Sequence, residues 1–250
     1  MTITPTMTNP PIIEAVLDIE CDFKEQPDIN KIEAKARKEM AKSYPKVRHV
    51  LFQEHQFEAK PSELRKISIK GGLHGLQFLK NDEKQVIQYR IEGFSFNRLA
   101  PYASLDSYLP QIKKNWSIYR ELTRPVQIRL IRLRYINRIL LPLMNGKVDL
   151  EEYILNGPRL ADPKRFDLTG FIDQYAAIDK QSGHQINSVL TLQQGDNDKL
   201  PVIFDNGVVA FETGNADDWQ WIRSKIVELR ELKNHIFCRT LTEKCLNLFQ

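Results

Sequence analysis

The segment Val126–Leu141, with the sequence VQIRLIRLRYINRILL, alternates basic and apolar side chains. Because a β-strand directs successive side chains to opposite faces, this pattern predicts one strand with two different faces. An isolated buried guanidinium group is too costly to leave without a partner, so the arginines are expected to meet carboxylates of this chain or a binding partner. One face carries Arg132, Arg134 and Arg138, and the other carries Leu133, Tyr135, Ile139 and Leu141.

A second segment, Ile13–Phe23, offers the carboxylates. Its odd positions are apolar, and its even positions include Glu14, Asp18, Glu20 and Asp22. If the two strands lie side by side, these acids face the arginines, and each pair of opposite charges across the sheet contributes about 0.2–1 kcal/mol. The arginine row is then an internal ladder of ion pairs. The alternative is a polar, uncovered sheet face that grips a partner, and the sequence leaves both interpretations open.

The arginine strand also divides the chain near its midpoint, and each half shows the same succession of strand, helix, several strands and long helix. This repetition predicts an α+β fold, with a single domain over residues 1–250 built from two pseudo-repeats over 11–124 and 125–250. We expect one curved antiparallel sheet with helices on one face and the two first strands adjacent at its centre. The order of elements resembles that of the TATA-binding protein.

Periodicity and breaker residues place the remaining elements. Strands are expected over 49–60, 64–70, 75–80, 85–97, 168–178, 185–194 and 200–212, and helices over 28–44, 105–122, 150–155 and from 217 onward with a break near 240. In the strand over 85–97 the apolar positions change phase at Gly93, which indicates a β-bulge. Pro110 conflicts with a regular first turn in the helix over 105–122.

Composition narrows the class of protein. The chain carries 36 basic and 32 acidic residues, a net charge of +4, which is too mild an excess to indicate a polyanionic partner by itself. No apolar run approaches the roughly 20 residues that span a bilayer, and the start of the sequence has no basic segment followed by an apolar one. The 3 cysteines have no C-x-x-C spacing. We therefore expect a cytoplasmic protein without membrane contact.

A row of lysines marks the first predicted helix, which Asp28 is expected to cap and Pro45 to end. Its apolar side carries Ile29, Ile32, Ala36 and Met40, and its opposite side carries Lys31, Lys35, Lys38 and Lys42. Such a row is typical of a solvated helix face. Contact with the phosphates of a nucleic acid is the alternative.

The sequence contains none of the common catalytic, nucleotide-binding or metal-binding motifs. The chain has no P-loop, no dinucleotide-binding glycine pattern, no nucleophile elbow and no H-E-x-x-H motif. Its five histidines show no ligand spacing. No catalytic residue, metal ligand or cofactor is therefore predicted. If the protein were an enzyme, the arginine row with Tyr135 and Asn137 would be the best place for an anionic small molecule.

Several phrases resemble the TIGR04255 family, sporadically distributed bacterial and archaeal proteins of unknown function. The matching segments are Asn9–Val16, Gly93–Leu99 followed by Pro101-Tyr102, Arg132–Arg138, His235–Phe237 and Leu241–Glu243. The resemblance runs over nearly the full chain, although Pro110 sits where the family has an uninterrupted helix. It implies a patchy distribution like that of toxin–antitoxin and phage-defence genes, and it assigns no catalytic residue.

These observations favour a non-enzymatic binding module with a protein partner in a defence or toxin–antitoxin-like operon. An exposed sheet face can hold a peptide, a helix or a nucleic acid without chemistry. The alternative is a nucleic-acid-binding protein that uses the sheet face or the lysine-rich helix. The residues predicted to bind are Arg132, Arg134, Arg138, Tyr135, Lys31, Lys35, Lys38 and Lys42. The sequence does not predict an oligomeric state.

Overall fold

The computed structural model describes residues 7–57, 67–155, 157–162, 165–193 and 198–250. In this part of the chain the fold is mixed α/β, with one open nine-stranded antiparallel sheet in the order β2-β3-β4-β5-β1-β6-β9-β8-β7. The strands are β1 (Ile12–Asp22), β2 (Lys46–Phe57), β3 (Ile67–Leu79), β4 (Gln85–Arg90), β5 (Gly93–Leu99), β6 (Gln127–Pro142), β7 (Ile172–Ile178), β8 (Gln185–Leu192) and β9 (Lys199–Ala210).

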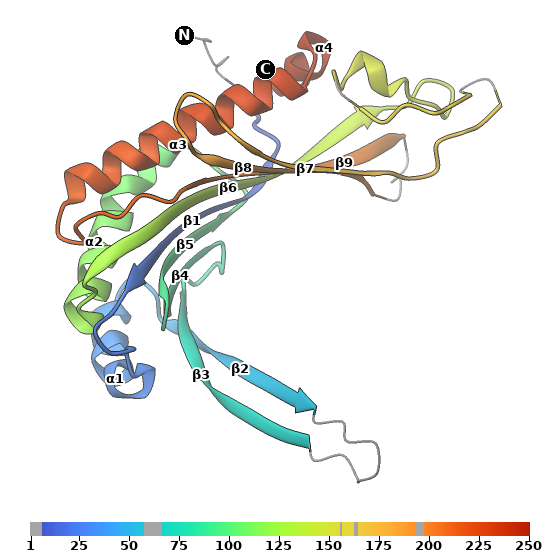
Figure 1. Ribbon diagram of the computed structural model, residues 1–250. Coiled ribbons are helices and arrows are strands. Elements are labelled where there is room, and N and C mark those ends of the chain that lie inside the picture. Colours follow the sequence, from blue (N-terminus) through green and yellow to red (C-terminus); the bar gives the residue numbers. More distant parts are fainter. Residues whose placement is uncertain (1–6, 58–66, 156, 163–164, 194–197) are drawn as a thin grey trace.

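Helices cover only one side of this sheet. They are α1 (Ile29–Met40), α2 (Leu105–Thr123), α3 (Trp219–Thr240) and the short α4 (Glu243–Leu246), with 3₁₀ turns η1 (Leu150–Glu152) and η2 (Asn247–Phe249). Figure 1 shows that the sheet is curved and that α1, α2 and α3 lie along its outer side. No described helix lies over the inner, concave side, which we call the open face.

The two predicted central strands do pair. β1 and β6 run antiparallel, with Leu17 opposite Leu133 and Asp18 opposite Arg132. From this centre the strands of each half run outward in reverse chain order, from β5 to β2 on one side and from β9 to β7 on the other. The arginine row and the acidic row therefore share the open face, because directly opposed residues in an antiparallel pair point the same way.

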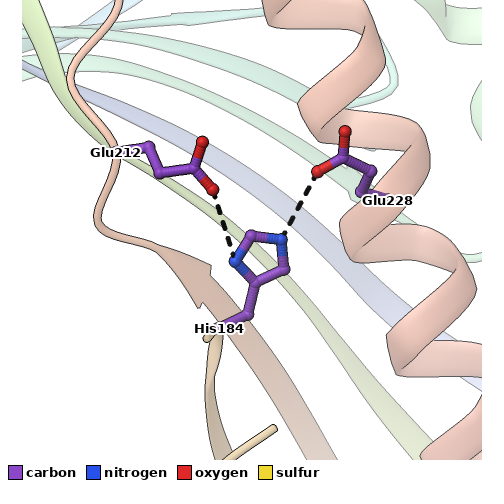
Figure 2. A group of neighbouring side chains, drawn as sticks. All are labelled: His184, Glu212 and Glu228. Carbon is purple, nitrogen blue, oxygen red and sulfur yellow. Dashed lines mark ion pairs between the residues drawn. The ribbon is translucent and has the colours of Figure 1, made fainter. Parts of the chain in front are cut away.

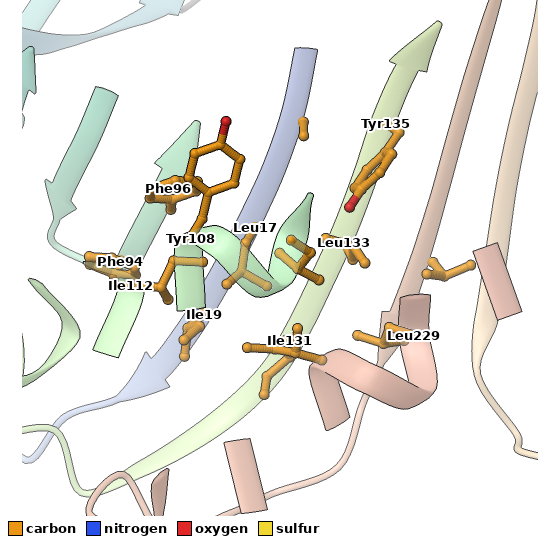
Figure 3. Packing of buried hydrophobic residues seen from close by; sticks show 14 of the residues in the cluster. Leu17, Ile19, Phe94, Phe96, Tyr108, Ile112, Ile131, Leu133, Tyr135 and Leu229 are labelled. Carbon is orange, nitrogen blue, oxygen red and sulfur yellow. The ribbon is translucent and has the colours of Figure 1, made fainter. Parts of the chain in front are cut away.

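The hydrophobic core fills the space between the sheet and the helices. Leu17 of β1 and Leu133 of β6 pack toward Ile112 of α2 and Leu229 of α3 (Figure 3). One continuous cluster draws buried residues from both halves of the chain. Each such side chain contributes roughly 1.5–3 kcal/mol on burial, so this layer fixes which face of β6 points inward.

Several predicted boundaries are wrong. The predicted strand over 85–97 is a hairpin of β4 and β5, and Gly93 begins the second strand instead of forming a bulge. The described residues of the predicted strands over 64–70 and 75–80 belong to one strand, β3. Residues 58–66, which include the end of the predicted strand over 49–60 and the start of that over 64–70, lie outside the described residues. Helix α1 ends at Met40, well before Pro45.

The helix ends show how local sequence sets these limits. α2 begins at Leu105 despite Pro110, because the hydroxyl of Ser104 accepts a hydrogen bond from the backbone N–H of Ser107. α3 ends at Thr240, so the predicted break is confirmed. The residue that caps α4 is Thr242, whose hydroxyl accepts a hydrogen bond from the backbone N–H of Cys245. The helix predicted over 150–155 is only the 3₁₀ turn η1.

Candidate functional site

The open face carries the arginine row, and its first member is paired as a ladder requires. Arg132 lies 3.6 Å from a carboxylate oxygen of Asp18 and 3.6 Å from one of Glu20. Asp18 also accepts a hydrogen bond from Nη2 of Arg90, across β5, at 3.0 Å. Only 7% of Asp18 is exposed, so this carboxylate is a buried acceptor shared by two arginines from different strands. The prediction of an internal ion-pair ladder is confirmed at this position.

Arg134 pairs with another strand than predicted. Its Nε donates to Oδ1 of Asp205 on β9 at 2.7 Å, and its Nη2 contacts Oδ2 of the same carboxylate. This two-point pair raises the pKa of Arg134 above its usual value, because the hydrogen bonds favour the charged form. The expectation that the acids of β1 satisfy Arg134 is therefore wrong, since Val16 and not an acid stands opposite it on β1.

Arg138 has no ion pair or side-chain hydrogen bond within the part of the chain that the structure describes, and its side chain is exposed. The residues opposite it across the neighbouring strands are Ile203 of β9, then Thr191 of β8, then Ile172 of β7. Around this row the open face is mainly apolar. We call this surface the β6–β7 patch, which comprises Ile136, Arg138, Leu140, Ile172, Val189 and Ile203.

The lysine row lies away from the arginine row. Lys31, Lys35, Lys38 and Lys42 are all exposed, and Lys42 lies beyond the last helical residue of α1. The buried face of α1 packs into the core on the helix side of the sheet. The lysines therefore point outward on the side opposite the open face, and the two predicted basic rows cannot form one continuous surface.

Tyr135 also lies on the helix side, because its odd position on β6 places it opposite the arginines in the alternation. There it lines a cavity of about 270 Å³ that opens to solvent. The cavity is bounded by the chain before β1, the start of α2, the middle of β6 and the second half of α3. Its lining includes Met7, Pro10, Pro11, Ile12, Tyr102, Ser104, Leu105, Tyr135, Asn137, Arg230, Lys233, Asn234 and Phe237.

Lys233 is the most unusual group in this cavity. Its side chain comes from α3, only 6% of the residue is exposed, and its Nζ lies 3.8 Å from the centre of the Tyr135 ring. Among the described residues no carboxylate pairs with it. Burial lowers the pKa of Lys233 to about 7; the nearby Cys238 thiol opposes this effect, and the positive charge of Arg230 adds to it.

Tyr102, Tyr135 and Arg230, which also line the cavity, already have hydrogen-bond partners. The hydroxyls of Tyr102 and Tyr135 share a hydrogen bond of 2.6 Å. Burial raises the pKa of Tyr135 to about 12 and that of Tyr102 well above its usual value. Arg230, at the edge of the cavity, donates to Asp106 at 2.7 Å. Lys233 is thus the one cation lining the described cavity that lacks a counter-ion.

A second cluster contains the buried His184, which precedes β8, with the more exposed side chains of Glu212 after β9 and Glu228 on α3 (Figure 2). The two imidazole nitrogens of His184 face different carboxylates, Nδ1 toward Glu212 at 3.9 Å and Nε2 toward Glu228 at 3.5 Å. Lys225 lies between the glutamates, with its Nζ at 2.8 and 2.9 Å from their oxygens. An ammonium group therefore already supplies the positive charge that a cation would bring to these acids.

No family model matches this chain, and no curated protein is significantly similar to it. In the part of the chain that the structure describes, no helix combines the length and the apolar character needed to cross a membrane. The site must therefore be interpreted from its own geometry.

Sequence reasoning missed Lys233, although a signal was present. In α3 the buried residues Ile222, Ile226, Leu229, Lys233, Ile236 and Phe237 recur at helical spacing. A lysine in the apolar stripe of an amphipathic helix is a departure that could have been noticed. The sequence could not show that Lys233 lacks a counter-ion, because this depends on how three other segments of the chain surround it.

Proposed function

We propose that the protein is a non-enzymatic binding module that holds a protein partner on the open face of its sheet and acts in a defence or toxin–antitoxin-like operon. The observation that carries the proposal is the β6–β7 patch, where Arg138, exposed and without an ion-pair partner among the described residues, stands among apolar side chains. The operon context rests on the sporadic distribution that the family resemblance implies.

The chemistry of the patch favours a protein surface as its occupant. Protein interfaces combine apolar side chains with arginine more often than the rest of the protein surface does. Ile172 is 76% exposed and Leu140 is 37% exposed, so the patch offers apolar contact area on both sides of Arg138. The free guanidinium group can bind a carboxylate with two hydrogen bonds. The partner is therefore expected to present an acidic residue among apolar ones.

The edge of the sheet supports the same proposal. β7 is the last described strand on its side of the sheet, so one row of its backbone N–H and C=O groups pairs with no strand that the structure describes. Ile178 at its end is 70% exposed, and Tyr175 on its other face is also exposed. An apolar edge strand of this kind is a template for strand addition by another chain.

A nucleic acid fits the same surface less well. Arg90, Arg129, Arg132 and Arg134 on the open face are each paired with a carboxylate of this chain. Phosphate binding needs basic groups that are free to replace counter-ions, and these arginines are not. In the lysine row Lys31 pairs with Asp28 at 3.5 Å, the other three lysines have no ion pair among the described residues, and the row lies on the opposite side of the molecule.

We propose in addition that the two halves are copies of one ancestral unit. The adjacency of β1 and β6, the outward order of the strands and the long helix that closes each half support this idea. The copies differ, since α1 has only the short turn η1 as its counterpart and the first half has one strand more. The likeness to the element order of the TATA-binding protein stays a prediction.

The test is recovery of the partner with variants that separate the two sides of the sheet. The affinity-tagged full chain is expressed in its native host with the neighbouring genes present, as the wild type, as Arg138→Glu and as Lys31→Glu. We expect the wild type and Lys31→Glu to recover the same stoichiometric protein. Arg138→Glu should recover at least about tenfold less of it, because a reversed charge at the centre of an interface costs 2 kcal/mol or more.

Three results would contradict the proposal. The wild type could migrate alone and recover no protein, Arg138→Glu could recover the partner as well as the wild type does, or the chain could retain DNA at low salt with a steep loss of affinity as salt rises. Circular dichroism of each variant shows whether a loss of recovery reflects a loss of fold.

A further inference from the structure

We infer that the cavity beside Lys233 is a binding site for a small monocarboxylate, whose carboxylate group pairs with the Lys233 ammonium and whose apolar body fills the rest of the space. This inference goes beyond the proposed protein-binding function, because the cavity lies on the helix-covered side of the sheet and the β6–β7 patch lies on the open face. Each can therefore fail without the other.

The first argument is a missing counter-ion. Lys233 lines the cavity, and only 6% of the residue is exposed. No carboxylate of the described residues lies within ion-pair distance of its ammonium group. The ammonium lies 3.8 Å from the centre of the Tyr135 ring, and a ring face compensates a buried ammonium only in part. Arg230 already has a counter-ion, because its guanidinium group lies 2.7 Å from a carboxylate oxygen of Asp106. The unmatched charge in the cavity is therefore a single positive one.

The start of α2 adds to this preference for an anion. Ala103, Ser104 and Leu105 line the cavity, and α2 begins at Leu105 and runs for 19 residues. The N-terminus of a long helix carries a partial positive charge, and here the first-turn N–H of Ser107 is already bonded to the Ser104 hydroxyl. The helix end and the Lys233 ammonium belong to different elements, and both face the same space.

The size and lining of the cavity indicate the rest of the ligand. A cavity of about 150 Å³ holds benzene, so the 270 Å³ here suits a molecule of on the order of ten non-hydrogen atoms. Pro10, Pro11, Ile12, Leu105 and Phe237 supply apolar walls. A single unpaired cation matches a single negative charge, so a compact aromatic or short aliphatic carboxylic acid fits better than a phosphate ester or a dicarboxylate.

Binding of such an anion must be linked to the protonation of Lys233. The charged and titratable groups around this amine are Tyr102, Tyr135, Cys238 and the Arg230–Asp106 pair. Burial raises the pKa of both tyrosines and of the thiol, so they stay protonated where the amine loses its proton. Above about pH 7 the Lys233 amine is neutral in the ligand-free protein. When a carboxylate binds, the amine should take up a proton and become an ammonium again.

The experiment uses isothermal titration calorimetry of benzoate and hexanoate into the full chain. The titrations are run at three pH values between about 6.5 and 8.5, each in two buffers of different ionisation enthalpy. Benzamide and hexanamide serve as neutral probes of the same shape. Lys233→Met removes the charge and keeps an unbranched side chain, and Lys113→Met on the exposed side of α2 is the matched control.

We expect at least one of the acids to bind the wild type and Lys113→Met equally, with uptake of close to one proton at the highest pH. The affinity should fall about tenfold per pH unit above pH 7, since protonation of the amine then precedes binding. The amides and Lys233→Met should bind at least about tenfold more weakly. Arg138→Glu should bind the acids as the wild type does.

The inference is overturned if neither acid binds the folded wild type, if an amide binds as tightly as its acid, or if Lys233→Met binds unchanged. Binding of inorganic phosphate in place of both acids would also reject the monocarboxylate class. Should Lys233→Met fail to fold, the proton uptake by the wild type decides, because binding without uptake at the highest pH excludes pairing with Lys233.

Discussion

Replacing Lys233 with methionine is expected to remove a pH-dependent cost from folding. The wild-type protein must bury the amine with 6% exposure and no carboxylate partner in the described part of the chain. Methionine has a similar length and no charge, so it keeps the packing of the side chain and leaves no ammonium to desolvate. The difference in stability between the two proteins then reports on this one group.

The sign of the effect follows from the lowered pKa. Burial lowers the pKa of Lys233 from 10.5 to about 7. Below pH 7 the amine is protonated in both states, and the full cost of burying its charge is present. Between pH 7 and about 10.5 the unfolded chain binds a proton that the native protein does not, so native stability rises with pH. The shift of about 3.5 units corresponds to roughly 5 kcal/mol over this window.

The assay is urea unfolding of the wild type and Lys233→Met at several pH values from about 7.5 to 9. Stability of the wild type relative to the variant should rise by about 1.4 kcal/mol per pH unit, or about 2 kcal/mol over this range. Burial raises the pKa of Cys21 and Cys245 to about 12, and these thiols act in the opposite direction at high pH. Both proteins contain them, so their contribution cancels in the difference. If the difference in unfolding free energy between the wild type and Lys233→Met does not change with pH, Lys233 is not a buried amine without a counter-ion.

Three further predictions concern the sheet. Asp18→Asn should lower the free energy of unfolding by about 2–3 kcal/mol in urea, between the values for surface and buried ion pairs, because it removes the negative charge that two arginines share. Gly93→Ala should cost about 3 kcal/mol or prevent folding by circular dichroism, since an added Cβ would lie 2.2 Å from the carbonyl oxygen of Ile19. A double-mutant cycle of Arg134→Met and Asp205→Asn should give a coupling of at most about 1 kcal/mol that shrinks with salt, because Arg134 is half exposed.

The central pairing of the sheet was accessible from the sequence because it depends on alternation alone. In β1 and β6 the apolar positions keep a period of two over most of the strand, and burial of one face fixes which side chains point inward. The charges then follow on the other face. The acidic row and the arginine row could therefore be placed on the same face of the sheet, but the alternation does not fix the register, and the pairing of Asp18 with Arg132 comes from the structure.

The hairpin of β4 and β5 could not be predicted from the alternation of apolar residues. The phase change at Gly93 fits either an extra residue in one strand or a tight turn between two strands, and both solutions bury Tyr89 and Phe94. The structure makes Ile91 and Glu92 the turn. Gly93 is required there for a tertiary reason, because the backbone of β1 passes too close for a side chain.

The partner of Arg134 was also beyond the sequence. Its position on β6 predicts only that it shares a face with the acids of β1. The neighbour on the other side, β9, follows in the chain after two more strands, and the alternation does not say which strand will lie there. Asp205 of that strand offers both carboxylate oxygens, and a two-point contact outcompetes the more distant Glu14.

The same alternation makes β6 part of both proposed sites. Its even positions place Arg134 and Arg138 on the open face, and its odd positions place Tyr135 and Asn137 at the cavity. The sequence predicts Tyr135 to bind together with the arginines, but a single step along a strand reverses the side of the sheet on which a side chain lies. Variants at neighbouring positions of one strand should therefore have separate effects. Arg138→Glu should change only the capture of the protein partner. Tyr135→Phe keeps the aromatic ring beside Lys233 and removes the Tyr135 hydroxyl, so it should change only the affinity for the carboxylate. A variant that changed both by the same factor would show that it acts through the fold of β6 and through neither site.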